Sequence, residues 1–357
     1  MSAAPANSFA FFARGIDGFY LPPESPCYAL VRGDTPEVEW AKSFLPADRV
    51  LEFHAPKLQA EVYPATESLL LSSDIARLLR RRKIGDLLLS SSCSAAMHDW
   101  SQQNKIRFLA ADFQHQRRLE NKIWFDRFLR RVGIRCPAGG TMIVGRKPPP
   151  IPRGRLVLQV HDSLGGEGTY FVDGADQLAA VAQEASLRPG QRCLVRQFIE
   201  GVTYGITIFV TPGAIALSAI RSQCYYPRGE NESRQRFAGV QWIPSDQISQ
   251  RLRKEIDRVL LRLGDELYRL RYFGVANVDF LVDGHEKVWI IECNPRMSAA
   301  TPQLLADPQL CGGINCGELF LQGFCGPRRC TANPRRLGLP ETTFAGATLD
   351  LLPGGDA

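Results

Sequence analysis

The stretch VANVDFLVDGHEKVWIIECN, residues 275–294, predicts a β-hairpin that turns at Asp283 and Gly284. Antiparallel pairing across this turn brings Asp279 on the first strand roughly opposite Glu292 on the second. Two carboxylates held within a few ångströms repel one another unless a cation lies between them. The hairpin therefore predicts a cation site.

The second strand of the hairpin carries three polar groups on alternate residues. Alternation places Glu292, Asn294 and Arg296 on one side of the strand. A set of oxygen ligands suits Mg²⁺, which keeps waters and shares its coordination with nucleotide phosphates. The alternative is an exposed edge hairpin with solvated acids. The apolar run VWII at 288–291 predicts burial on both faces and favours the metal site.

Length and composition are those of an ordinary globular protein. The 357 residues suffice for two or three compact units, and 45% are hydrophobic and 22% charged. No apolar run approaches the roughly 20 residues that span a bilayer, and the first residues lack the pattern of a signal peptide. We therefore expect a cytoplasmic protein with no membrane partner.

The net charge of +6 raises nucleic acid as a partner. The arginines, however, are spread in short groups, several of them within helical patterns, where a solvated helix face is the usual explanation. These groups lie at residues 80–82, 117–118, 130–131 and 335–336. We expect no nucleic-acid partner, because a non-catalytic nucleic-acid-binding protein would leave the acidic hairpin unexplained.

The ten cysteines include no Cys-x-x-Cys pair. Their nearest approach to a cluster is irregularly spaced, contains no histidine and consists of Cys311, Cys316, Cys325 and Cys330. Scattered reduced thiols are favoured over a zinc site.

Residues 1–112 predict a small α/β unit with a parallel sheet, since strands and helices alternate. The expected strands are PCYALVRG (26–33), DLLLSSSC (86–93) and IRFLAAD (106–112), and the expected helices lie at 37–44, 72–85 and 94–103. For the second helix, Ser72 or Ser73 is the expected N-cap and Gly85 the closing residue.

The remainder of the chain predicts a mixed α+β arrangement. A helix starts at Lys122, a proline-rich connector covers 145–154, and a long amphipathic helix covers 247–271. Further strands are expected at RLVLQV, TYFVDG, RCLVRQFIEG and YGITIFVTPG, with a helix near 175–184. The segment 327–357, rich in proline, glycine and arginine, is expected to drape over the surface.

The loop LGGEG at 164–168 joins two of these strands, so its bare backbone N–H groups can approach a polyanionic phosphate. By itself this is weak evidence, because glycine-rich hairpins are common. Lys122 stands at a helix start in a chain with few lysines, and a lone lysine in that place is usually an ordinary surface residue.

Taken in order, these pieces resemble the ATP-grasp superfamily of carboxylate–amine ligases, which includes D-alanine–D-alanine ligase, biotin carboxylase and amino acid ligases. The likeness runs from about 119 to 326 through NKIWFDRFLRRVGIRCPAG, LVLQVHDSLGGEGTYFV, LVRQFIEG and VDFLVD…VWIIECNPR. It implies an α/β (α+β) ATP-grasp fold with a pre-ATP-grasp domain at 1–112, an ATP-grasp domain at 113–326, a mobile lid at about 138–197 and a C-terminal tail at 327–357.

The resemblance also implies residue roles. Asp279 and Glu292 would hold one Mg²⁺, and Glu292 with Asn294 a second, both on the phosphates of ATP; Mn²⁺ is an alternative. Arg296 would stabilise negative charge at the reacting centre. The nucleotide would be held by Lys122, by the glycine loop, and by the linker, with backbone atoms of Gln197 and Ile199 meeting adenine; the full set is Lys122, Gln159, Gly165, Gly166, Gly168, Gln197, Phe198, Ile199 and Glu200.

Three positions depart from the family pattern. Gln159 stands where the lid strand usually carries a lysine, and Arg196 stands where the linker usually begins with an acid. Thr203 stands where a ribose-binding acid is common, a role that Glu200 could take. These changes bear on the individual ATP contacts more than on the nucleotide itself.

The implied activity is an ATP-dependent ligase that activates a carboxylate as an acyl phosphate and joins it to an amine, releasing ADP and phosphate. A small-molecule kinase on the same scaffold is the alternative. The polar segment 220–242 reads equally as a substrate-binding region, with Arg221 or Arg234 on a substrate carboxylate, or as a solvated loop. The expected partners are a small carboxylate and an amine, and a homodimer stays open.

Overall fold

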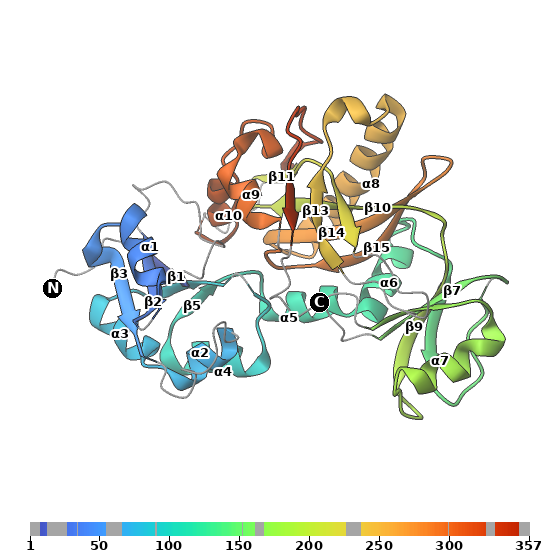
Figure 1. Ribbon diagram of the computed structural model, residues 1–357, viewed down its shortest axis with the longest axis horizontal. Coiled ribbons are helices and arrows are strands. Elements are labelled where there is room, and N and C mark those ends of the chain that lie inside the picture. Colours follow the sequence, from blue (N-terminus) through green and yellow to red (C-terminus); the bar gives the residue numbers. More distant parts are fainter. Residues whose placement is uncertain are drawn as a thin grey trace, which may run out of the picture.

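Three β-sheets organise the chain, and each carries its own helices (Figure 1). The computed structural model describes residues 8–12, 27–33, 35–54, 66–89, 91–151, 153–160, 168–225, 237–298, 300–325 and 333–349. In Figure 1 the N-terminal sheet lies at the left, the largest sheet above the centre and the smallest sheet at the lower right. The helices α5 and α6 run between them.

The N-terminal sheet is parallel throughout, with strand order β3-β2-β1-β4-β5, as its alternating strands and helices predict. Its strands are β1 Phe9–Phe12, β2 Cys27–Arg32, β3 Val50–Phe53, β4 Asp86–Leu88 and β5 Arg107–Leu109. Its helices are α1 Glu37–Phe44, α2 Thr66–Ser72, α3 Ile75–Arg82 and α4 Ala95–Asn104. The sequence interpretation did not include β1 and β3.

The start and end of α3 differ from the prediction. Ser72 closes α2 instead of capping α3, and Asp74 occupies the N-cap position. At the other end Lys83, with φ of 58°, takes the left-handed conformation expected of Gly85. The helix therefore ends two residues earlier than glycine placement indicates.

The largest sheet has eight strands and contains the predicted hairpin. Its order is β15-β14-β10-β12-β13-β17, with β11 joining β10 to β16. Its strands are β10 Gly201–Val210, β11 Ala214–Leu217, β12 Arg221–Tyr225, β13 Phe237–Trp242, β14 Gly274–Asp283, β15 Val288–Asn294, β16 Arg335–Leu337 and β17 Ala347–Leu349. The long helix α8, Gln250–Arg269, follows a 3-10 turn at Ser245–Gln247 and buries its apolar stripe, including Leu260 and Leu263, against this sheet.

The segment after residue 332 does more than drape over the surface. β16 pairs parallel with β11, and β17 pairs antiparallel with β13 at the sheet edge. Between them, the backbone N–H of Leu339 donates to Asp257 on α8 at 2.7 Å. For the described residues 333–349 the prediction of a surface tail is therefore wrong.

The smallest sheet is antiparallel, with order β6-β9-β7-β8. Its strands are β6 Gly139–Ile143, β7 Leu156–Val160, β8 Thr169–Val172 and β9 Arg192–Gln197, and α7 Leu178–Glu184 follows a 3-10 turn at Ala175–Gln177. The proline-rich connector joins β6 to β7 without forming an element. We call this unit the lid sheet; that it moves as a lid stays a prediction.

The remaining helices connect the sheets. They are α5 Phe113–Glu120, α6 Lys122–Arg131, α9 Thr301–Ala306 and α10 Cys316–Cys325, with 3-10 turns at Ala47–Arg49 and Pro308–Cys311. Asn121 lies between α5 and α6 and caps the latter, since its side chain accepts from the N–H of Trp124 at 2.9 Å. Within the described ranges, no helix has the length and apolarity needed to cross a bilayer.

Candidate functional site

The hairpin β14–β15 forms in the predicted register. Asp279 lies directly opposite Glu292, and Asn277 lies opposite Asn294. The amide of Asn294 donates to Glu292 Oε1 at 3.2 Å, so these two side chains share one face of β15 as alternation predicts. The first strand therefore supplies one carboxylate, and the second supplies a carboxylate and an amide.

An irregularity in the hairpin keeps this polar face apart from the core. Phe280, the residue after Asp279, pairs with Ile290, so that β15 contains one extra residue at this point. As a result Ile290 and Cys293, three residues apart, are both buried. Trp289 and Ile291 are half-buried, so the prediction that 288–291 is buried on both faces is wrong for one face.

The two carboxylates perturb one another. Burial and the charge of Glu292 raise the pKa of Asp279 from 3.8 to about 7, against the opposing charge of Arg221. Although burial alone would raise it, Lys122 and the Asn294 amide hold the pKa of Glu292 below its usual value. Lys122 Nζ lies 3.7 Å from Glu292 Oε2. Half-buried oxygen ligands that repel one another fit a divalent cation, and Asp279, Glu292 and Asn294 are the residues that would hold it.

Arg221 is a buried neighbour of Asp279, which together with Glu292 forms the two carboxylates that we call the metal pair. Its side chain is 3% exposed and donates to Thr207 Oγ1 at 3.1 Å and to Asn277 Oδ1 at 3.0 Å. Its guanidinium carbon also lies 5.7 Å from the centre of the Trp242 ring. Burial lowers the pKa of Arg221 to about 10, and the nearby charge of Asp279 opposes this shift. These contacts hold Arg221 where the charge of Asp279 acts on it; that Arg221 binds a substrate carboxylate stays a prediction.

Asn277 is a residue that sequence reasoning missed. Its Oδ1 accepts from Thr207 Oγ1 at 2.7 Å, from Arg221, and from Ser298 Oγ at 3.1 Å. Its Nδ2 donates to the backbone carbonyl of Arg296. One buried amide thus joins Thr207 on β10 and Arg221 on β12 to the loop that follows β15. The available signal was its position two residues before Asp279, on the same face of the strand.

Arg296 is held from α5. Its Nε donates to Glu120 Oε1 at 3.3 Å, and Glu120 also accepts from Ser92 in the loop after β4. Beside this pair, buried Gln116 accepts from the N–H of Cys93 at 2.8 Å. The end of α5 therefore ties the loop after β4 to the predicted catalytic arginine. No periodic pattern predicts this link, which joins residues 176 positions apart.

The linker after β9 begins with residues whose backbone bonds to neighbouring segments. The N–H of Gln197 donates to the carbonyl of Ala138 at 2.7 Å. That backbone atoms of Gln197 and Ile199 meet adenine stays a prediction. The N–H of Phe198 donates to Arg155 at 2.9 Å, and its ring packs edge-on against Phe171 with centroids 5.8 Å apart. The ring of Phe198 therefore points into the lid sheet. Glu200, beyond it, is exposed.

The glycine loop lies largely outside the described residues. Gly165 and Gly166 belong to the undescribed part, and Gly168 is the first described residue after it. The carbonyl of Gly168 accepts from the N–H of Val160 at 2.9 Å, which continues the β7–β8 pairing to the base of the loop. The phosphate-binding role of the loop stays a prediction.

The two family departures in the lid sheet contact one another. Arg196 on β9 is 3% exposed and donates through Nη2 to Gln159 Oε1 on β7. Its Nη1 donates to the carbonyl of Ile291, the residue before Glu292, at 3.0 Å. The guanidinium thus connects the lid sheet to β15, which we call the metal strand because it carries Glu292 and Asn294.

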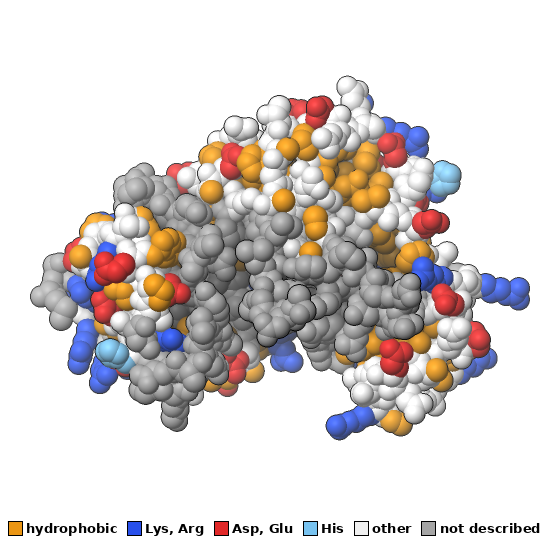
Figure 2. Space-filling model, in the orientation of Figure 1, with side chains coloured by type: hydrophobic (Ala, Val, Ile, Leu, Met, Phe, Trp, Pro, Cys, Tyr) orange, Lys and Arg blue, Asp and Glu red, His pale blue; other side chains and the backbone are white. Residues whose placement is uncertain are grey.

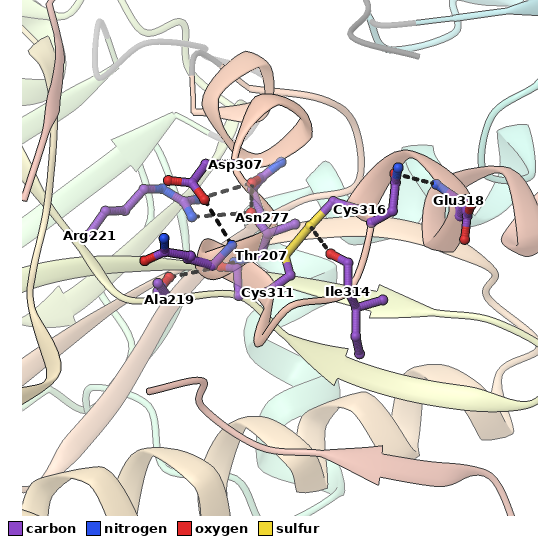
Figure 3. Close-up of a disulfide and its surroundings, with 12 residues drawn as sticks. Thr207, Ala219, Arg221, Asn277, Asp307, Cys311, Ile314, Cys316 and Glu318 are labelled. Carbon is purple, nitrogen blue, oxygen red and sulfur yellow. Dashed lines mark hydrogen bonds between the residues drawn. A yellow bond between two sulfur atoms is a disulfide. The ribbon is translucent and has the colours of Figure 1, made fainter. Parts of the chain in front are cut away.

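A disulfide joins Cys311 to Cys316 near this site (Figure 3). It links the 3-10 turn before Gly312 to the start of α10, and Gly312 and Gly313, with φ of 65° and 80°, reverse the chain between the two cysteines. Reduced thiols are therefore a wrong prediction for this pair. The described cysteines that are free are Cys27, Cys93, Cys136, Cys193, Cys224 and Cys293. Across the described ranges, no group of three or more His, Cys, Asp or Glu is placed for a metal.

Comparisons with known proteins agree with this geometry. A family model described as an ATP-grasp domain matches residues 119–300. The carbamoyl phosphate synthase large chain of Thermotoga neapolitana is 24% identical over 201 residues, which cover 55% of this chain and 18% of that protein. That of Thermotoga maritima is 23% identical over 252 residues, covering 67% and 22%. The chain thus matches only about a fifth of the length of these relatives.

Solved structures share the fold. Biotin carboxylase from Campylobacter jejuni, in complex with β-γ-ATP, superposes with a TM-score of 0.64 at 13% identity over 91% of this chain and 72% of that one. L-amino acid ligase from Bacillus licheniformis gives a TM-score of 0.60 at 15% identity, covering 90% and 74%. N5-carboxyaminoimidazole ribonucleotide synthetase gives 0.60 at 10% identity, covering 96% and 80%. Identities this low support the shared fold alone.

Proposed function

The chain belongs to the ATP-grasp family, and on that premise we propose that it is an ATP-dependent ligase that activates a carboxylate and joins it to an amine. ATP and Mg²⁺ are the cofactors of the family. An amino acid or another small carboxylic acid is the proposed substrate, and the product is an amide or peptide. The similarity of the fold to that of an L-amino acid ligase supports this choice.

The observation that carries the proposal is the pairing of Asp279 with Glu292 beside Lys122. Two adjacent, half-buried carboxylates are stabilised by a cation between them, and a lysine next to them can meet the phosphates that such a cation binds. Asp279, Glu292 and Asn294 would hold the magnesium. When bound, Mg²⁺ supplies positive charge that neutralises the phosphate oxygens.

The nucleotide would lie between the lid sheet and the metal strand. The carbonyl of Gln197 would accept from the adenine amino group, and the N–H of Ile199 would donate to the ring. Lys122 would contact the phosphates from the start of α6, where the helix presents its positive end. Closure of the lid sheet would exclude water from the reactive acyl group.

The reaction would proceed in two displacements. A substrate carboxylate oxygen attacks the γ-phosphorus of ATP, the bond to the β-phosphate oxygen breaks, and ADP leaves. The amine nitrogen then attacks the carbonyl carbon of the acyl phosphate, loses its proton, and inorganic phosphate departs. Arg296, held in place by Glu120, would stabilise the negative charge on the acyl phosphate and on the oxyanion of the tetrahedral intermediate.

The domain boundaries follow from the same premise. We propose that 1–112 is the pre-ATP-grasp domain, that 113–326 is the ATP-grasp domain with its lid at about 138–197, and that 327–357 is a C-terminal segment. Within this segment, β16 and β17 pair with strands of the largest sheet. This pairing supports including the described residues 333–349 in the ATP-grasp domain.

Release of ADP and phosphate, screened against pairs of carboxylic acids and amines, tests the activity. A ligase predicts release that requires both partners and a condensed product in the mass spectrum. Phosphate release that never depends on an amine contradicts the proposal, and phosphate that stays on the substrate identifies a kinase. The Glu292→Gln variant is the blank, and Glu286→Gln, a change in the exposed turn of the same hairpin, is its matched control.

A further inference from the structure

Arg196 is a charged side chain enclosed between the lid sheet and the metal strand. With 3% of its surface exposed, it donates to a carbonyl of β15 and to the side-chain oxygen of Gln159. Both acceptors are neutral. These bonds use two of the five N–H groups of the guanidinium.

The nearest carboxylate to Arg196 is already committed. Asp126 Oδ1 lies 3.9 Å from Arg196 Nη1, beyond hydrogen-bond distance. Both oxygens of Asp126 bind Arg130 instead, at 2.8 Å to Nε and 3.1 Å to Nη2. Asp126 therefore hydrogen-bonds Arg130 and acts on Arg196 through its charge alone, without a hydrogen bond.

The other acid whose charge acts on Arg196 is Glu292, which also faces Lys122. Burial lowers the pKa of Arg196, as expected for a cation with incomplete compensation. An enclosed guanidinium of this kind is stabilised when an anion arrives beside it.

The position of Arg196 selects the anion. It immediately precedes the linker proposed to meet adenine, and its acceptors lie on β7 of the lid sheet and next to Glu292 on β15. A nucleotide seated between those strands brings its phosphate chain to this space. We infer that Arg196 is a phosphate-contacting residue of the nucleotide site and that Gln159 positions its guanidinium; this inference rests on the nucleotide-binding part of the proposed function.

A purely structural role is the competing explanation, in which Arg196 docks the lid sheet onto the metal strand. The two roles differ in how affinity depends on phosphate. A phosphate contact favours ADP over adenosine, whereas a docking contact affects both ligands alike. The ratio of the two affinities therefore separates them.

The test measures ADP and adenosine binding, both with Mg²⁺, by competition against a fluorescent ADP analogue. For Arg196→Gln we expect ADP affinity to fall about 10- to 100-fold and adenosine affinity to change less than about twofold. Gln159→Leu should lower the ADP affinity by a smaller factor, because the guanidinium loses one support. Arg192→Gln, an exposed change on the same strand, is the matched control and should leave both affinities unchanged.

Arg196→Lys keeps the charge. It provides the test if Arg196→Gln is not folded, as judged by the absence of a cooperative unfolding transition. It should recover part of the preference for ADP. An ADP-to-adenosine ratio equal to that of the wild type in both variants overturns the inference, as does a parallel fall of both affinities. Failure of the ligase assay with normal ADP binding would instead overturn the proposed activity and leave Arg196 in its role.

Discussion

Asp279 and Glu292 lie opposite each other in the β14–β15 hairpin, and Ile291, the residue before Glu292, is the extra residue of β15. This arrangement lets one strand serve two environments. Ile290 and Cys293 face the core, while Glu292 faces Lys122 and shares its side of the strand with Asn294. The charged face is thereby kept next to a rigid apolar layer, as a metal site requires.

The raised pKa of Asp279 predicts competition between Mg²⁺ and a proton. Because the metal binds the ionised carboxylate, Mg²⁺ affinity should rise about tenfold per pH unit up to about pH 7 and then level off. Titration of Mg²⁺ into the ADP-bound protein from pH 5.5 to 8.5 measures this. The Asp279→Asn variant, which keeps Glu292, should bind Mg²⁺ weakly and with an affinity that does not rise in this way with pH. An equal dependence of Mg²⁺ affinity on pH in both proteins would contradict Asp279 as the titrating ligand.

The same shift has a consequence for the metal-free protein. The folded-state pKa of Asp279 lies above its unfolded value of 3.8, so the bound proton stabilises the fold. That contribution is present below pH 3.8 and is lost as the pH rises through about 7. We expect MgADP to raise the melting temperature more at pH 8 than at pH 6. A larger rise of the melting temperature at pH 6 than at pH 8 would contradict the raised pKa of Asp279.

Arg296, which is proposed to act at the reacting centre, forms an ion pair with Glu120. Arg296→Lys keeps the charge but loses the fork of donors, so kcat should fall about 100-fold while ADP affinity changes less than about twofold. Glu120→Gln weakens the support for Arg296 and should lower kcat about tenfold. Steady-state rates with the substrate pair found in the screen measure both. A loss confined to KM would place Arg296 outside the reacting centre.

Asn277 predicts a large stability effect for a single buried amide. Asn277→Ala leaves Thr207, Arg221 and the carbonyl of Arg296 without their common partner, and should cost about 3 kcal/mol in the free energy of unfolding. Urea unfolding measures this. Asn104→Ala, which removes one hydrogen bond at the end of α4, is the control and should cost less than about 1 kcal/mol. Equal costs for the two changes would contradict the hub role of Asn277.

Thiol chemistry tests the cysteine assignments. Burial raises the pKa of Cys93 to about 12 and that of Cys136 to about 11, from 9.0. Their thiolate fraction at pH 8 should therefore be roughly 100- to 1000-fold lower than usual, and it should rise only as the pH approaches 11. In iodoacetamide mapping without reductant, Cys224 should react first among the six described free cysteines, because it is half-buried while the other five are buried. Labelling of Cys311 in the unreduced, native protein would contradict the disulfide.

The β14–β15 hairpin, the long helix and the N-terminal sheet follow from patterns that are local in the sequence. Alternation and a turn predict the hairpin at 275–294 and its register, and the apolar stripe predicts α8. The parallel N-terminal sheet follows from the order of its elements, although the four residues of β1 are too few for a periodic signal. Short strands and helix ends are decided by tertiary contacts that periodicity does not contain.

The supports of the site are different, since they join distant segments. Arg196 meets Gln159 across 37 positions, and Arg296 meets Glu120 across 176. The two departures in the lid sheet become understandable once they are seen to bond to each other. The disulfide was missed because five-residue spacing in a glycine-bearing turn resembles an ordinary loop. Pairing of this kind is set by the fold and leaves no spacing rule in the chain.

The central claim is that Asp279, Glu292 and Asn294 hold the divalent cation that binds the nucleotide phosphates. A crystal structure with MnADP, recorded with anomalous scattering from manganese, tests it most directly. We predict a manganese peak between the carboxylates of Asp279 and Glu292, within about 2.0–2.3 Å of their oxygens and in contact with the ADP phosphates. A manganese peak elsewhere, with ADP bound away from this hairpin, would contradict the claim.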